Sequence, residues 1–215
     1  EDIAAADSLN CSVRHLNFLD SPLRRNQKDV LFQPLSEEQA TISEVCKYFD
    51  QLKREYPAST IFYCPLGVGW HIDHLVTFEA ACKCISMENL RFYAEAPYRL
   101  VKFQTELRTS GLRSIDLNLF SRSFFSTQYV KAYLSHWNNK ILLDKITNYE
   151  NLTVPTSLYL SHEIQLNELL ISKGLAAKAE YKSQIAFSDL RTPQTNIEFY
   201  YSLSNQQKGQ ISELN

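Results

Sequence analysis

The chain has 215 residues and a formal net charge of −2, with 44% hydrophobic and 21% charged residues. This composition is ordinary for a globular protein, and the length suffices for one domain with a sizeable core. The near-neutral charge, without a long basic run, argues against nucleic acid as a partner. No stretch reaches the run of about 18 apolar residues that predicts a transmembrane segment.

The first quarter of the chain predicts two helices with a strand between them. Residues 1–9 are rich in alanine and are typical of the end of a helix. The imperfect alternation of residues 13–19 predicts a strand, and residues 20–25 a loop at its carboxyl end. Ser36–Gln39 matches a capping box, after which apolar residues recur at helical spacing until shortly before Pro57.

The next segment predicts a βαβ unit with a polar motif at its first turn. An apolar strand at residues 60–64, a helix from about residue 73 to 87 and a strand at 89–94 imply a parallel pair. Between the first strand and the helix stands P-L-G-V-G-W-H-I-D-H, residues 65–74. Because ligands bind at the carboxyl ends of strands in open α/β sheets, this motif is the first candidate site.

The second half of the chain predicts more helix than strand. Residues 121–148 are expected to be largely helical, and residues 157–185 to form a long helical region, broken at Gly174. Residues 195–203 alternate and predict a final strand, and residues 206–215 are expected to fray. The five cysteines form no C-x-x-C pair and several lie in apolar patterns, which favours reduced core thiols and a cytoplasmic protein.

The motif H-I-D-H has a spacing that suits chemistry. If the helix begins by Ile72, His71 and His74 are three residues apart and share a face, while Asp73 points toward another neighbour. A histidine pair beside a carboxylate suits metal ligation or proton transfer, although a simple helix cap would use the same residues. Two of the chain's five glycines directly precede the motif, which favours a ligand site.

Two further groups follow predicted strands. Asp20, Arg24 and Arg25 can hold sugar hydroxyls or a substrate anion, or they belong to an ordinary surface loop. Tyr93 and Glu95 follow the strand at 89–94. They can contact substrate or orient a histidine, or else they pack a loop. The residues alone leave these alternatives open.

Residues 65–74 resemble the second signature of the PIG-L, or LmbE-like, zinc-dependent de-N-acetylases. Three further segments resemble other parts of that family in the same order, namely L-D-S-P-L-R-R at 19–25, F-Y-A-E-A-P-Y at 92–98 and Y-K-S-Q at 181–184. The resemblance implies a single domain over residues 1–215 with a Rossmann-like three-layer α/β/α fold and a mostly parallel sheet. It also implies removal of an N-acetyl or N-acyl group from an amino-sugar substrate or glycoconjugate.

The resemblance also implies roles for individual residues. His74 would bind Zn²⁺ or another divalent metal, and His71 would be the acid or the group that stabilises the oxyanion. Asp73 would hold His71 in its useful tautomer and raise its basicity. The substrate-binding residues would be Asp20, Arg24, Arg25, Tyr93 and Glu95.

The chain departs from the family at one point. The first family signature, A-H-P-D-D-E, which supplies two zinc ligands and the general base, does not occur in the sequence. We therefore expect an amino-terminally incomplete domain, apparently without its first strands, that by itself binds zinc weakly and is inactive. The alternatives are a non-catalytic relative that binds a sugar or a partner, and a metal-independent Rossmann-like enzyme. The particular N-acyl substrate and the oligomeric state do not follow from the sequence.

Overall fold

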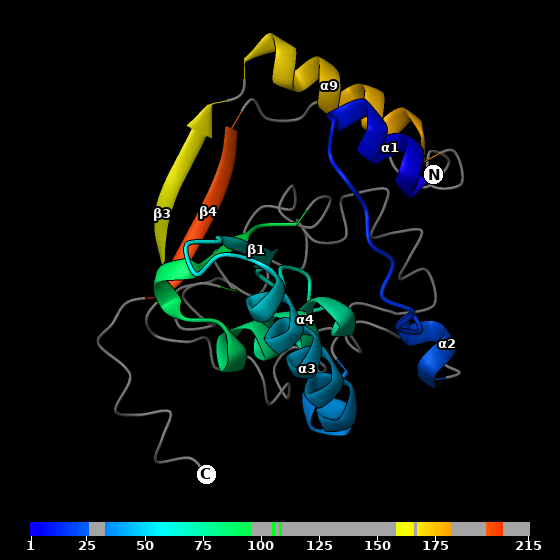
Figure 1. The fold of residues 1–215 in the computed structure, drawn as a ribbon, viewed down its shortest axis with the longest axis vertical. Helices are drawn as coiled ribbons and strands as arrows, with labels where there is room; N and C mark the ends of the chain where they lie inside the picture. The colour runs from blue at the N-terminus through cyan, green and yellow to red at the C-terminus, as the bar shows by residue number, and fades with distance from the viewer. Residues whose placement is uncertain are drawn as a thin grey trace, which may run out of the picture.

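A computed structural model describes residues 1–25, 33–95, 105, 108, 158–165, 167–181 and 197–203. The helices are α1 (Asp2–Leu9), α2 (Ser21–Arg25), α3 (Gln39–Glu55), α4 (Ile72–Cys84) and α9 (Glu168–Ala179), with short 3-10 turns η1 (Leu35–Glu38) and η2 (Met87–Asn89). The strands are β1 (Phe62–Pro65), β2 (Leu90–Tyr93), β3 (Leu158–Gln165) and β4 (Ile197–Leu203). Figure 1 shows their arrangement.

The described strands form one sheet in the order β1-β2-β4-β3. Strands β1 and β2 are parallel, with Phe62 opposite Leu90 and Cys64 opposite Phe92, which confirms the predicted βαβ unit. The pairs β2–β4 and β3–β4 are antiparallel. Within the described residues, the expectation of a mostly parallel sheet is therefore wrong, whereas a coarse α/β fold is what the structure has.

Helices α3 and α4 pack on one face of the parallel pair, beside each other (Figure 1). The ring of Phe49 on α3 meets Phe62 edge-on at 6.1 Å, and the ring of Phe78 on α4 lies 4.6 Å from that of Phe92. Successive strand residues point to opposite faces, and Tyr63, on the other face, is 56% exposed. The described core thus lies between the α3–α4 pair and β1–β2, directly beneath the start of α4.

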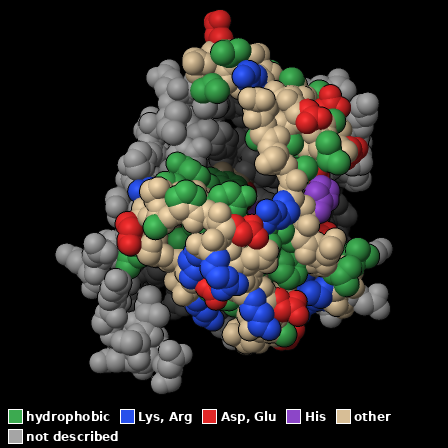
Figure 2. All heavy atoms as spheres, viewed as in Figure 1, with side chains coloured by type: hydrophobic (Ala, Val, Ile, Leu, Met, Phe, Trp, Pro, Cys, Tyr) green, Lys and Arg blue, Asp and Glu red, His purple; other side chains and the backbone are tan. Residues whose placement is uncertain are grey.

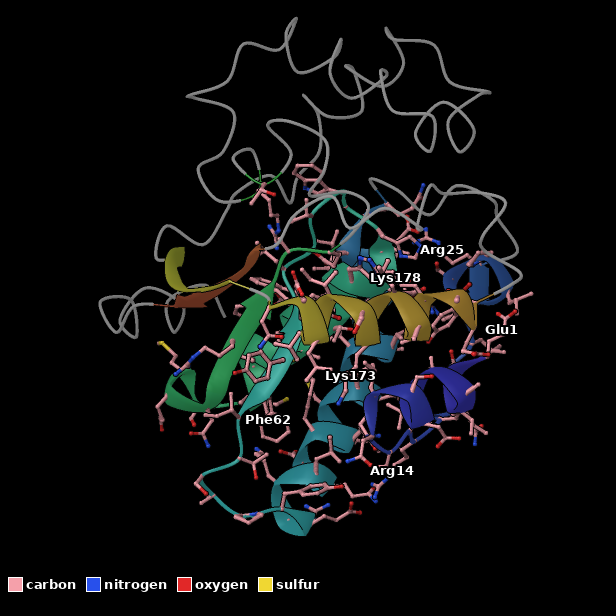
Figure 3. All side chains as sticks on the ribbon, turned by 90° about the horizontal axis from the view of Figure 1, so that it is seen from above. Glu1, Arg14, Arg25, Phe62, Lys173 and Lys178 are labelled. Atoms are coloured by element: carbon pink, nitrogen blue, oxygen red, sulfur yellow. The ribbon has the colours of Figure 1, made fainter. Side chains whose placement is uncertain are left out.

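Helices α1 and α9 and strands β3 and β4 lie farther from this core. Helix α1 packs against α9, and the two lie side by side in Figure 1. Lys173 and Lys178 both belong to α9 and are labelled on either side of it in Figure 3. Strands β3 and β4 pair along most of their length and connect to the core through the short β2–β4 pairing.

Three expectations for the first forty residues differ from the structure. Residues 13–19 are not a strand: residues 11–20 are exposed, and Asn17 has a φ of 57°, which breaks an extended backbone. Residues 21–25, expected as loop, form α2. The segment Ser36–Gln39 does not act as a capping box, because it falls within η1 and at the start of α3, and neither element has a side-chain cap hydrogen bond.

The expected long helical region at 157–185 is also wrong in its first part. Residues 158–165 form β3, because they pair with β4, and α9 begins only after Asn167, whose Oδ1 accepts a hydrogen bond from the Leu170 amide at 2.9 Å. Helix α9 runs through Gly174 without a break, and a Cβ there would meet nothing within 4 Å. The final strand is confirmed as β4.

Two expectations concern residues that the structure does not describe. The helix expected at 121–148 and the fraying expected at 206–215 lie outside the described residues. Among the helices that the structure describes, none is long and apolar enough to cross a membrane. Figure 2 shows lysine, arginine and acidic side chains intermingled on the lower part of the face in view, rather than a patch of one sign.

Candidate functional site

The candidate site is built where β1 and β2 end side by side. The pairing continues one step beyond β1, because the Leu66 amide donates to the Tyr93 carbonyl at 2.9 Å. The chain then turns through Gly67–Trp70 into α4, while the chain after β2 reaches Glu95 two residues later. Segments nearly thirty positions apart in the sequence are therefore brought to one edge of the sheet, as expected for a parallel pair.

The turn into α4 requires glycine. Gly67 has a φ of 82°, and a Cβ there would lie 2.7 Å from Cδ2 of Leu75. Trp70 has a φ of 56°, which is unusual for a bulky side chain, and it is fully buried. Because Trp70 immediately precedes His71, this packed and strained turn fixes the direction in which α4 begins.

Glu95 holds this turn from the neighbouring strand. Its carboxylate is 4% exposed and accepts hydrogen bonds from the backbone amides of Gly67, at 2.6 Å, and Val68, at 3.0 Å. The same carboxylate lies 3.2 Å from Nδ1 of His74. Successive backbone amides in such a turn form an anion-binding concavity. Here the anion is a side chain of the chain itself, and it also contacts the predicted metal ligand.

His71 is the amino-terminal cap of α4. Its Nδ1 accepts a hydrogen bond from the Asp73 backbone amide at 3.3 Å, so the ring is neutral and carries its proton on Nε2. Burial lowers the pKa of His71 to about 4, and the neighbouring His74 contributes in the same direction. His71 is therefore a half-buried, neutral imidazole whose Nε2 carries a hydrogen-bond donor.

The two histidines lie together, as their spacing predicts. The ring centroids of His71 and His74 are 4.9 Å apart, with the ring planes at 37°. Helix α4 begins at Ile72, so the condition for a shared face is met. The structure therefore brings the predicted acid and the predicted metal ligand into contact.

Asp73 has a different neighbour from the one that the resemblance implies. Its carboxylate accepts hydrogen bonds from the Ser21 backbone amide at 3.0 Å and from Arg24 at 2.8 Å. Burial alone would raise the pKa of Asp73, but hydrogen bonds from Asp20, Arg24 and Ser21 outweigh it and lower the pKa to about 2. Asp73 contacts His71 through its backbone amide. The charge of its carboxylate acts to raise the pKa of His71, against the larger effect of burial, and the role expected for this carboxylate in catalysis stays a prediction.

The predicted substrate-side arginines bind carboxylates of the chain. Besides Asp73, Arg24 contacts Oε2 of Glu38 at 3.0 Å. Arg25, labelled in Figure 3, contacts Oε1 of Glu38 at 3.3 Å and also Glu37. Glu38 is 4% exposed, so this ion pair is largely removed from water. The contacts with Asp73 fasten α2 to the start of α4, and those with Glu37 and Glu38 fasten it to η1. A role of the two arginines in substrate binding stays a prediction.

The other two predicted substrate-side residues lie at the edges of the site. The Asp20 carboxylate is near Asp73, whose hydrogen bond is the main reason that the pKa of Asp20 is raised. Tyr93 is 37% exposed and points away from the face that packs on α4, where Phe92 lies. Burial raises the pKa of Tyr93 to about 12, and the charge of Glu95 adds to this.

Sequence reasoning missed Arg108. This side chain is 3% exposed, donates from Nε to the Leu66 carbonyl at 2.8 Å and places its guanidinium carbon 4.6 Å from the Phe78 ring centroid. It also lies 3.4 Å from where a Cβ of Gly67 would be. The mixed pattern around residue 108 carries no signal for such a buried cation, which only the tertiary contact reveals.

The described residues do not form a complete metal site. No group of three or more His, Cys, Asp or Glu side chains among the described residues is arranged to hold a metal ion. Comparison of the chain with protein-family models, with curated proteins and with solved structures found no match.

Proposed function

We propose that the protein is a hydrolase that removes an N-acetyl or N-acyl group from an amino-sugar-containing substrate with the help of Zn²⁺ or another divalent metal. The resemblance of residues 65–74 to the PIG-L signature motivates the proposal. A further part of it is that the α/β fold belongs to a Rossmann-like three-layer architecture, for which the βαβ unit of β1, α4 and β2 is the support.

The observation that carries the proposal is that the Nδ1 atoms of the two neighbouring imidazoles have different partners, a backbone amide for His71 and a carboxylate for His74. Nδ1 of His71 accepts a hydrogen bond, so its Nε2 is a donor. Nδ1 of His74 lies 3.2 Å from the Glu95 carboxylate, the arrangement in which a carboxylate holds one nitrogen of a histidine and leaves the other for a metal. One ring thus offers a hydrogen bond and the ring beside it offers a metal ligand.

The described residues around His74 form only part of a metal site. His74, backed by Glu95, has the arrangement of a metal-ligating histidine whose other nitrogen is held by a carboxylate. Among the described residues, no group of three or more His, Cys, Asp or Glu side chains completes a site around it, and the family motif that would supply further ligands, A-H-P-D-D-E, is not in this sequence. We therefore derive no step of the reaction through a metal.

The part of the chemistry that this chain can supply concerns the carbonyl oxygen of the amide. Hydrolysis places negative charge on that oxygen in the tetrahedral intermediate, where a fixed hydrogen-bond donor lowers the barrier. The Nε2–H group of His71, held by the cap hydrogen bond, is such a donor. Of the two roles considered for His71, its neutral tautomer favours oxyanion stabilisation over proton donation.

The test uses the protein produced from its complete reading frame. N-acetylglucosamine conjugates are incubated with it before and after chelation and re-addition of Zn²⁺, and the free primary amine released is measured. We expect metal-dependent release that is abolished by His74→Ala and strongly reduced by His71→Asn. The matched control is His15→Ala, since His15 is an exposed histidine away from this site.

Two results would contradict the proposal. Amine release that survives chelation would favour a metal-independent enzyme. No release with any divalent metal, from a protein whose complete frame also lacks H-P-D-D, would favour a non-catalytic relative that binds a sugar or a partner.

A further inference from the structure

Two cysteines face each other between the helices that pack on the sheet. Cys46 lies in the middle of α3 and Cys84 is the last residue of α4. Both side chains are half-buried, so neither is sealed from solvent. They take no part in the candidate site, which lies at the opposite end of α4.

Two contacts place α3, with Cys46, against the last turn of α4, which ends at Cys84. Sγ of Cys46 lies 3.8 Å from the Ala80 carbonyl oxygen. In an α-helix that oxygen points toward the amide four residues later, which here belongs to Cys84. Two turns further along α3, Nζ of Lys53 donates to the Cys84 carbonyl at 2.8 Å, so α3 passes directly beside the end of α4.

We propose that Cys46 and Cys84 form a reversible disulfide that staples α3 to α4. Cys46 lies against the turn of α4 that ends at Cys84, so rotation of the two side chains on these packed helices can bring the sulfurs to bonding distance. The helix packing that holds them is itself part of the core, through Phe49 and Phe78. The modification is therefore a cross-link within one chain, and its reactant is a disulfide such as oxidised glutathione.

The exchange proceeds in two balanced steps. One cysteine thiolate attacks a sulfur of oxidised glutathione, which forms a mixed disulfide and releases one glutathione thiolate. The second cysteine thiolate then attacks the protein sulfur of the mixed disulfide and releases the other glutathione. The two protein thiols are oxidised by two electrons in total, glutathione disulfide is reduced to two thiols, and each departing thiolate takes up a proton released by a protein thiol.

The surroundings determine the rate of this exchange. Burial, followed by the interaction with the Cys46 side chain, raises the pKa of the Cys84 thiol to about 12. Since the thiolate is the reactive form, oxidation is slow at neutral pH and accelerates as the pH rises. The neighbouring Lys53 ammonium acts in the opposite direction and favours the thiolate.

The other three cysteines serve as controls. Cys64 is 4% exposed on β1, and burial raises its pKa to about 12 as well. Cys82 lies two residues before Cys84 on α4, and burial likewise raises its pKa to about 12. Cys11 is exposed in the segment after α1.

The test incubates the protein at mildly alkaline pH with oxidised glutathione, blocks remaining thiols with an alkylating reagent and maps the cysteine-containing peptides by mass spectrometry. We expect a Cys46–Cys84 peptide pair that dithiothreitol separates. In the chain-entropy picture, closing a loop of roughly 40 residues raises the thermal midpoint by roughly 10 °C. Cys46→Ser and Cys84→Ser should each abolish both effects, whereas Cys11→Ser should leave both intact.

Mapping the cysteine-containing peptides distinguishes the results that support the disulfide from those that contradict it. Alkylation of both Cys46 and Cys84 after an incubation that oxidises Cys11 would overturn the proposal. So would stable glutathione adducts on both residues, because they would show that the second step cannot occur. Peptide mapping of the unmodified sequence needs no variant to fold, so the proposal can be refuted even if a serine variant is unstable.

Discussion

The substitution Glu95→Gln tests whether one buried carboxylate holds the turn that carries the histidines. Each carboxylate oxygen accepts one backbone amide, from Gly67 at 2.6 Å and from Val68 at 3.0 Å. Glutamine has nearly the same shape but only one acceptor oxygen, and its amide group would face the other backbone N–H. One buried donor would lose its acceptor, and the remaining hydrogen bond would no longer be charge-assisted.

These two losses give an expected size for the effect. An unsatisfied buried amide costs about 1–3 kcal/mol, and the change from a charged to a neutral acceptor costs about 1 kcal/mol more. We therefore expect the free energy of unfolding to fall by about 3 kcal/mol, which for a chain of this size lowers the thermal midpoint by roughly 6–12 °C. Urea denaturation followed by circular dichroism measures the change directly.

The control for Glu95→Gln is Glu79→Gln on α4. Glu79 pairs with Lys83 at 3.2 Å on the surface of the helix, and its side chain is 35% exposed. Exposed pairs of this kind contribute about 0.5 kcal/mol or less. If Glu95→Gln were no more destabilising than Glu79→Gln, the carboxylate would not be what holds the turn, and the account of the site given above would be refuted.

Three further substitutions address the cap residue His71, the glycine turn before α4 and a glycine within α9. In metal-free protein the pKa of His71 is about 4 against an ordinary 6.5, so acidification through this range should lower the free energy of unfolding by about 2–3 kcal/mol. His71→Asn keeps a capping acceptor but cannot protonate, and should remove that pH dependence in denaturation curves. Gly67→Ala should destabilise by about 2 kcal/mol or more, because of the positive φ and the close approach of Leu75. Gly174→Ala, in open space on α9, should instead stabilise by about 0.5–1 kcal/mol.

The histidine pair and the βαβ unit could be predicted because both depend on short-range pattern. An apolar strand, a glycine turn and an apolar-periodic helix leave few other ways to fold, and a three-residue spacing places His71 and His74 together once the helix begins at Ile72. Residues 158–165 show the limit of such patterns. Their apolar positions also fit a helix, and only pairing with β4, some forty residues later, makes them a strand.

The partners of the charged residues could not be predicted, because they depend on contacts between distant segments. Arg24 was expected to face a substrate, yet it binds Asp73 and Glu38, which follow it by 49 and 14 positions. Glu95 was expected beside the substrate or a histidine, and it contacts His74 while also accepting the amides of the turn. A sequence shows that such residues are charged and close to a strand end. It does not show which charge each one meets.

The placement of the two histidines depends on these distant contacts as well as on the motif itself. Helix α4 is held at its amino end from two directions, by Glu95 through the preceding turn and by α2 through Asp73. A carboxylate in the first turn of a helix is favoured by the helix dipole, so Asp73 stabilises the same end that Glu95 positions. The acceptor nitrogen of His71 is set within the motif, by the Asp73 backbone amide. The motif therefore supplies the spacing and the helix cap, whereas the segments around residues 20 and 95 hold in place the end of the helix that carries both rings.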